Sequence, residues 1–196
     1  MPRSEHRMTR ADILPMEVYG RERAERRRAM TALKKNRRVS VGPDATFYFE
    51  SYDTMWQQVH EMLYIEKGGE SQIADELSAY NSLIPQKNEI VATVMFEIDN
   101  AARRAQVLAA LGGVEKHMSL RVGGETVAGV PETDLDYTSE EGKASSVQFV
   151  HFALSPEQAT RFCQAGTEII VAITHPDYSH MAVMPENVRQ ALAGDL

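Results

Sequence analysis

Two stretches in the second half of the chain repeat one pattern, and this repeat constrains the fold more than any other feature. Residues 89–122 and 145–174 each have the pattern of a strand, a helix and a second strand. The joints between first strand and helix, "FEID" and "FALS", align Phe96 with Phe152. Ser155 begins a capping box with Pro156 at the first helical position, a strong signal for a helix start.

Two such units joined by a hairpin predict a ferredoxin-like split β-α-β sheet with strand order 4-1-3-2. Asp99 at the first joint is expected to cap its helix as Ser155 does at the second. The fold class is therefore α+β, with an N-terminal helical and β-hairpin region packed on the sheet. We expect residues 1–86 to form that region and residues 87–196 the ferredoxin-like domain, together making one compact unit.

The N-terminal region contains a basic helix from about residue 21 to 35, rich in helix-forming Ala, Arg, Leu and Lys. Two short strands follow around a turn at residues 42–44. Asp53 is expected to cap a second helix, and a third begins after Gly68 and Gly69 and ends before Pro85.

Residues 123–144 are rich in glycine and carry a net charge of −5, so we expect them to form a mobile arm. Residues 184–196 have the pattern of a short C-terminal helix.

The composition is that of a globular protein, with 43% hydrophobic and 25% charged residues among 196. No apolar run is long enough to cross a bilayer, and the N-terminus lacks the apolar segment of a secretory signal. Cys163 is the single cysteine, so we expect neither an internal disulfide nor an iron–sulfur cluster held by one chain. These features favour a cytoplasmic location. No cofactor is indicated by the residues.

Charge is distributed unevenly along the chain. Through residue 38 there are 12 basic and 5 acidic residues, whereas the remainder has 9 basic and 23 acidic ones. The basic helix suits an acidic protein partner, or else it lies solvated against the acidic body of its own chain. Nucleic acid binding is disfavoured because that body would repel phosphates. The candidate partner-binding residues are Arg26, Arg27, Arg28, Lys34 and Lys35.

Alternation along the four repeat strands predicts a sheet with one apolar face and one mixed face. Glu97, His117, Arg121 and His151 fall on the mixed face, with Glu97 and His151 on neighbouring central strands. We expect this face to be covered either by the N-terminal helices or by a second subunit, as in dimeric α+β barrels. An enclosed acid, imidazole and guanidinium suit a small anionic ligand or acid–base chemistry. The alternative is a structural, hydrogen-bonded histidine.

Glu66 falls on the apolar side of the second helix, where a carboxylate needs a partner such as the basic helix. His175, Asp177 and His180 in "THPDYSH" offer metal-ligand atoms, although the same residues are equally typical of a plain turn. No Glu-x-x-His or His-Glu-x-x-His sequence occurs, which disfavours a ferritin-like di-iron centre and excludes a zincin.

The segments "TRADILPMEVY", "ALKKNRRVSVGPDATFYFESYDTMWQQVHEML" and "NSLIP" resemble a bacterial family, the domain of unknown function family 3501, over nearly the whole chain. That family carries no assigned activity or catalytic residues. Its genes often lie beside those of a rubrerythrin and an iron–sulfur protein. The resemblance therefore implies an accessory protein of a redox or peroxide-defence module, acting through those partners. Our alternative hypothesis is a small-anion- or metal-binding protein, or an enzyme, that uses the mixed sheet face.

Overall fold

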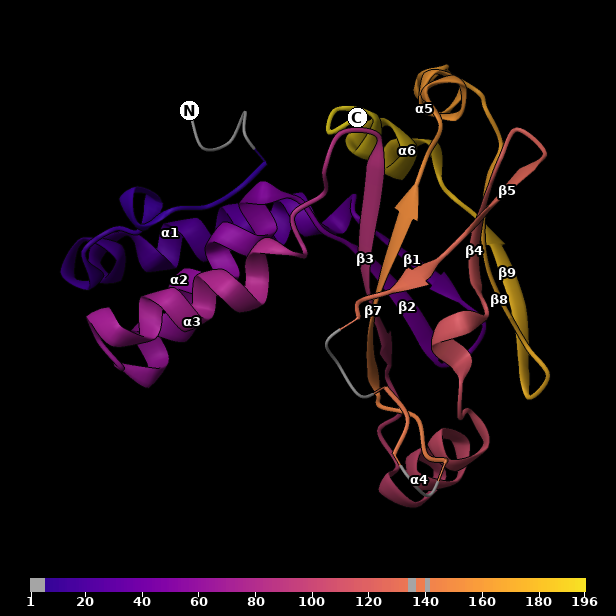
Figure 1. The fold of residues 1–196 in the computed structure, drawn as a ribbon, viewed down its shortest axis with the longest axis horizontal. Coiled ribbons are helices and arrows are strands. Elements are labelled where there is room, and N and C mark those ends of the chain that lie inside the picture. Colours follow the sequence, from indigo (N-terminus) through magenta and orange to yellow (C-terminus); the bar gives the residue numbers. More distant parts are fainter. Residues whose placement is uncertain (1–5, 134–136, 140–141) are drawn as a thin grey trace.

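A computed structural model describes residues 6–133, 137–139 and 142–196 of the chain. It has two parts: a lobe of three helices at the N-terminus and a body built from two β-sheets (Figure 1). The helices are α1 (Met16–Lys35), α2 (Tyr52–Glu66), α3 (Glu70–Asn81), α4 (Ala101–Ala110), α5 (Pro156–Cys163) and α6 (Glu186–Ala193). All six were predicted from the sequence, including the C-terminal one. The described part of the chain contains no helix with the length and apolar character needed to span a membrane.

The strands form two antiparallel sheets, which we call sheet A and sheet B. Sheet A has the order β1-β2-β3-β7-β6 and sheet B the order β5-β4-β8-β9. Their strands are β1 (Arg38–Val41), β2 (Ala45–Phe49), β3 (Glu89–Phe96), β4 (Met118–Val122), β5 (Glu125–Ala128), β6 (Val130–Pro131), β7 (Val147–Ala153), β8 (Ile169–His175) and β9 (Tyr178–Val183). Because β2 pairs directly with β3, the N-terminal hairpin is part of sheet A rather than a layer on top of it.

The α+β class is confirmed, but the strand order 4-1-3-2 in one sheet is wrong. The central strands β3 and β7 do pair, as predicted. Their unit partners β4 and β8 instead pair with each other in sheet B. Each strand–helix–strand unit therefore starts in one sheet and ends in the other, and the repeat gives two related halves with β3 beside β7 and β4 beside β8.

The exposure of α4 explains this difference. In a ferredoxin-like sheet the two crossover helices cover one face, and each needs a broad apolar stripe. Leu108 is the one residue of α4 that is buried, and α4 lies at one end of the body while α5 and α6 lie at the other (Figure 1). The apolar faces of the sheets are covered by each other, in a shared core that includes Phe96, Phe152, Leu120 and Val171.

Three local expectations also need correction. Ser51, not Asp53, caps α2 and accepts a hydrogen bond from the Thr54 N–H; Asn100, not Asp99, caps α4. The described parts of the acidic segment 123–144 are not a projecting arm, since they form β5, β6 and an isolated bridge between Thr138 and Ala144. Residues 134–136 and 140–141 of that segment lie outside the described residues.

The "THPDYSH" segment is a β-hairpin connecting β8 and β9. Tyr178 begins β9, and its hydroxyl accepts hydrogen bonds from the Asp44 and Ala45 N–H groups at 2.9 Å each. The same hydroxyl donates to the Val41 carbonyl at 2.8 Å. This side chain therefore ties sheet B to the turn between β1 and β2.

Candidate functional site

The helical lobe covers the outer face of sheet A. An apolar cluster joins α2, α3 and the residues before α1 to Val91 of β3 and Phe149 of β7. Of the two coverings expected for the mixed face, the structure therefore has the N-terminal helices. The strand alternation predicted the side chains on this face, and the pairing of β2 with β3 adds Thr46, Tyr48 and Glu50 to them.

A cavity of about 270 Å³ lies where the lobe meets this face. Its walls are aromatic, methionine and aliphatic side chains with a few polar groups among them. They come from Lys34, Tyr48, Glu50, Met55, Gln58, Tyr80, Leu83, Thr93, Met95, Val147 and Phe149. A wider groove between residues 6–10 and α3 is open to solvent, and its described lining contains no buried charged side chain.

Glu50 is the buried acid of the cavity, only 8% exposed. Its Oε1 accepts a hydrogen bond from the Thr93 hydroxyl, and its Oε2 accepts one from the Thr54 hydroxyl, both at 2.6 Å. Among the described residues no cationic side chain forms an ion pair with this carboxylate. A buried carboxylate that lacks a cation is costly, so its presence in the wall of a cavity makes this cavity the candidate site.

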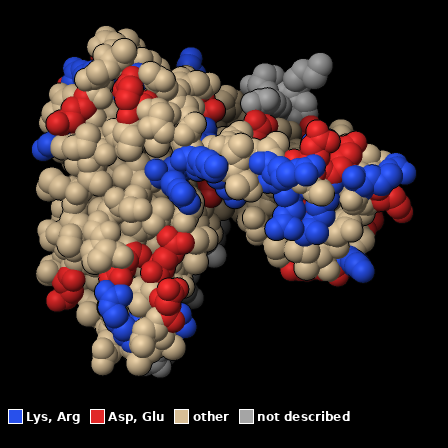
Figure 2. Space-filling view, turned by 180° about the vertical axis from the view of Figure 1, so that it is seen from behind, with Lys and Arg blue, Asp and Glu red and all other residues tan. Residues whose placement is uncertain are grey.

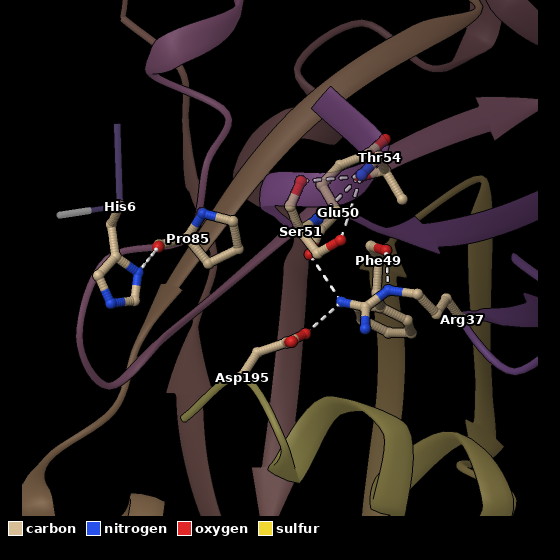
Figure 3. A network of polar contacts seen from close by, with 8 residues as sticks. All are labelled: His6, Arg37, Phe49, Glu50, Ser51, Thr54, Pro85 and Asp195. Atoms are coloured by element: carbon tan, nitrogen blue, oxygen red, sulfur yellow. Dashed lines mark hydrogen bonds and ion pairs between the residues drawn. The ribbon is translucent and has the colours of Figure 1, made fainter. Parts of the chain in front are cut away.

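Arg37 fixes the chain at Glu50 (Figure 3). Its buried guanidinium donates to the backbone carbonyls of Phe49 at 3.0 Å and Glu50 at 2.8 Å. It also donates to Asp195 near the C-terminus at 2.5 Å. The Glu50 N–H donates to the Val91 carbonyl at 2.8 Å. These contacts hold the position at which β2 ends and α2 begins.

Lys34 is the second charged residue of the cavity lining, and it comes from the last turn of α1. It is partly buried, and its side chain makes no hydrogen bond or salt bridge with any described residue. The cavity thus carries one acidic and one basic group that do not pair with each other.

Glu97 and His151 lie on the same sheet but are not brought together. His151 is opposite Val91 in the register of β3 and β7, whereas Glu97 follows the far end of β3, about 20 Å away at 3.3 Å per residue. Glu97 is exposed and accepts a hydrogen bond from the Tyr48 hydroxyl at 2.9 Å. Across the strands of sheet A, Val91 lies beside His151, and Glu50 lies on the other side of Val91. The acidic residue level with His151 is therefore Glu50.

His151 sits between two carboxylates at the other border of the face. Its Nδ1 lies 3.0 Å from Glu89 Oε1, and its Nε2 lies 3.3 Å from Glu132 Oε2. The second contact lacks hydrogen-bond alignment, so among the described residues Nε2 makes no hydrogen bond and lies only close to the Glu132 carboxylate. Burial by itself would lower the pKa of His151, but the two carboxylates outweigh it and raise that pKa. The arrangement supports the structural interpretation of this histidine.

The remaining predicted ligand residues lie apart from the cavity. His117 precedes β4 and packs against the His175 ring, with 5.2 Å between ring centroids. Arg121 in β4 is exposed and lies 3.7 Å from Glu168. Glu66 ends α2 on the exposed side, not on the apolar side, and accepts a hydrogen bond from the Gln72 amide at 2.6 Å.

The three candidate metal ligands, His175, Asp177 and His180, make different contacts. Nε2 of His175 contacts the Gly112 carbonyl at 3.2 Å, and its Nδ1 accepts from the Asp177 N–H at 3.2 Å. His180 packs its ring on Tyr178. Within the described ranges, no three His, Cys, Asp or Glu side chains are grouped so as to hold a metal ion.

The five candidate partner-binding residues of α1 divide into two groups. Arg26 forms a salt bridge with Glu22 and lies over the Trp56 ring at 4.8 Å, and Lys34 faces the cavity. Arg27, Arg28 and Lys35 are exposed and make no salt bridge with a described residue. Figure 2 shows the helical lobe with Lys and Arg side chains gathered on its surface, beside acidic ones.

The family to which the chain belongs is shown by its match to a family model. Residues 7–196 match the family model described as "Protein of unknown function (DUF3501)". A crystal structure of a protein of unknown function from Burkholderia pseudomallei K96243 is 35% identical to this chain, with a TM-score of 0.88. The match covers 96% of this chain and 98% of that one. No curated protein matches the chain.

Proposed function

We propose that this protein binds a small organic molecule in the cavity between sheet A and the helical lobe, with Glu50 as its polar anchor. The observation that carries this proposal is a buried carboxylate in the wall of a mainly apolar cavity. Two hydroxyl groups hold it, and no described cationic side chain forms an ion pair with it. Ligand sites are commonly of this kind: apolar walls with a few fixed polar groups. The cavity volume corresponds to about nine water molecules at liquid density.

The methionines of the protein provide a direct test. Met55 and Met95 line the cavity, whereas Met181 is 66% exposed on β9. In protein labelled with methyl-¹³C-methionine, a compound that binds the cavity is expected to shift the Met55 and Met95 methyl signals and leave Met181 in place. A library of small polar metabolites supplies the compounds, and Met55→Leu and Met95→Leu assign the signals.

Cavity filling separates binding in the cavity from binding elsewhere. Val147→Trp places a large ring in the cavity and is expected to abolish the shifts, while Val130→Trp, at a 57% exposed position outside it, leaves them unchanged. If no compound in the library moves the two cavity methyl signals, or if shifts persist in folded Val147→Trp protein, the proposed function is wrong.

A second candidate function is binding of an acidic protein through α1, as expected for an accessory protein of a redox or peroxide-defence module. The exposed and unpaired Arg27, Arg28 and Lys35 favour it. We would measure whether this protein co-purifies with the rubrerythrin and the iron–sulfur protein that the family resemblance implies. Arg27→Glu with Arg28→Glu is expected to remove the partner, and Arg121→Glu, an exposed arginine of sheet B, to retain it. An unchanged complex in the α1 variant contradicts this role.

A further inference from the structure

The cavity carries two opposite charges on different elements: Glu50 where β2 ends and Lys34 in the last turn of α1. We propose that its ligand is a small zwitterion, such as a free amino acid with an apolar side chain. The ammonium group of the ligand would bind Glu50, and its carboxylate would bind Lys34. This inference rests on the proposed function, because it names the ligand class of the same cavity.

Charge matching favours a zwitterion over ligands that carry a single charge or none. A ligand with only a positive group would satisfy Glu50 but leave Lys34 beside another cation, and a purely anionic ligand would meet Glu50. A neutral ligand would supply no charged partner to either group in a partly dehydrated site, where electrostatic interactions are stronger than in water. A zwitterion supplies a partner for each, through charge-assisted hydrogen bonds.

The hydrogen-bonding capacity of Glu50 fits an ammonium group. A carboxylate offers about four lone-pair positions, and the hydroxyls of Thr54 and Thr93 occupy one on each oxygen. Those two bonds also fix the carboxylate plane (Figure 3 shows the Thr54 contact). Acceptor positions therefore remain for an N–H donor that enters from the cavity.

The remaining walls fit an apolar side chain. Aromatic rings of Tyr48, Tyr80 and Phe149 and the thioethers of Met55 and Met95 make up much of the lining. Methionine adapts to irregular shapes, and aromatic faces pack well against aliphatic groups. A cavity of about 270 Å³ suits an amino acid of medium size better than a nucleotide or a long-chain lipid.

Four probes with a matched carbon skeleton test the charge requirement. They are L-leucine, 3-methylbutylamine with the cation alone, 4-methylpentanoate with the anion alone, and the neutral 4-methylpentanamide. L-methionine and L-phenylalanine are added as further zwitterions. We expect at least one zwitterion to shift the Met55 and Met95 methyl signals, and the best of them to bind at least about tenfold more tightly than every single-charge or neutral probe.

Charge-removing variants give the reciprocal result. Glu50→Gln is expected to weaken zwitterion binding by at least about tenfold and to improve 4-methylpentanoate binding. Lys34→Gln is expected to weaken zwitterion binding similarly and to improve 3-methylbutylamine binding. Lys35→Gln, at the adjacent exposed lysine outside the cavity lining, is the matched control and leaves all affinities unchanged.

The outcomes distinguish this inference from the proposed function. If single-charge or neutral probes shift the cavity methyl signals as strongly as the zwitterions, the cavity binds ligands but the zwitterion inference is overturned. It is also overturned if none of the three amino acids shifts those signals, or if Glu50→Gln and Lys34→Gln bind them like the unaltered protein. Failure of the whole metabolite library, in contrast, overturns the proposed function itself.

Discussion

Replacing Phe152 with alanine is expected to lower the free energy of unfolding by about 3–5 kcal/mol, the usual cost of removing a buried phenylalanine side chain. Phe152 of β7 is completely buried, in the core that the two sheets share. The loss combines the transfer free energy of the ring with the cavity that remains between rigid sheets. Urea unfolding followed by circular dichroism measures it.

Phe96 provides the matched comparison, because it holds the same place in the other half of the repeat and is 3% exposed. Phe96→Ala is expected to cost a similar amount, whereas Met181→Ala on the outside of β9 changes stability by no more than about 0.5 kcal/mol. A loss below about 1 kcal/mol in both phenylalanine variants would contradict a single core between sheets A and B.

The local elements were predictable because their signals lie within a few residues of each other. The capping box of Ser155 and the turn at Gly42 determine element ends through local hydrogen bonds and backbone conformation. At Gly42 the φ angle is +72°, and an added Cβ would lie 2.6 Å from the His180 ring. The turn therefore requires glycine, as its sequence indicated.

The arrangement of the strands was not predictable in the same way. Pairing of β4 with β8 depends on contacts between residues about fifty positions apart, and the repeat is compatible with one sheet or two. The feature that distinguishes two sheets from one is the weak apolar stripe of α4. This helix contains Leu108 and Val107 but mostly small and charged residues. A helix of this composition cannot cover a sheet face, so a second sheet must do so.

The candidate site was predictable only in part. Alternation predicts a mixed face that requires a cover, and it places Glu97 on that face, whereas the acidic residue that lines the cavity is Glu50. The sequence predicts the hairpin of β1 and β2 as a region separate from the sheet, and in that arrangement Glu50 does not fall on the mixed face. Once β2 is paired with β3, the period of two along "TFYFE" places Glu50 on the mixed face beside Thr93.

Acidification from pH 6.5 to 5 is expected to lower the free energy of unfolding by about 1.5 kcal/mol through His60. Its ring is completely buried, stacked on Trp56 with 3.7 Å between centroids. Nδ1 contacts the Trp56 carbonyl at 2.7 Å, and Nε2 accepts the Leu14 N–H at 3.1 Å, so the neutral ring is the form that fits. Burial lowers the pKa of His60 from 6.5 to about 4.

The sign follows from proton binding. Between pH 6.5 and about 4 the unfolded chain binds a proton at His60 that the folded protein does not, so stability falls as pH falls. His151 acts in the opposite direction: its raised pKa gives stability that is complete below pH 6.5 and is lost as pH rises through the folded value. For carboxylates such as Glu61, whose partner Arg23 lowers the pKa from its ordinary value of 4.5, the contribution to stability is present above about pH 4.5 and is lost as pH falls below it.

Two variants separate the fall in stability at acidic pH (the acid limb) from the fall at alkaline pH (the alkaline limb). Stability is measured by urea unfolding at intervals from pH 5 to 8.5. His60→Gln is expected to be less stable at pH 7 and to flatten the acid limb while leaving the alkaline one, because the proton uptake of the unfolded chain is then gone. His151→Gln is expected to flatten the alkaline limb alone. If stability still falls as steeply between pH 6.5 and 5 in His60→Gln, another group binds the proton. The neutral His60 ring would then not be what holds α2 against the segment before α1.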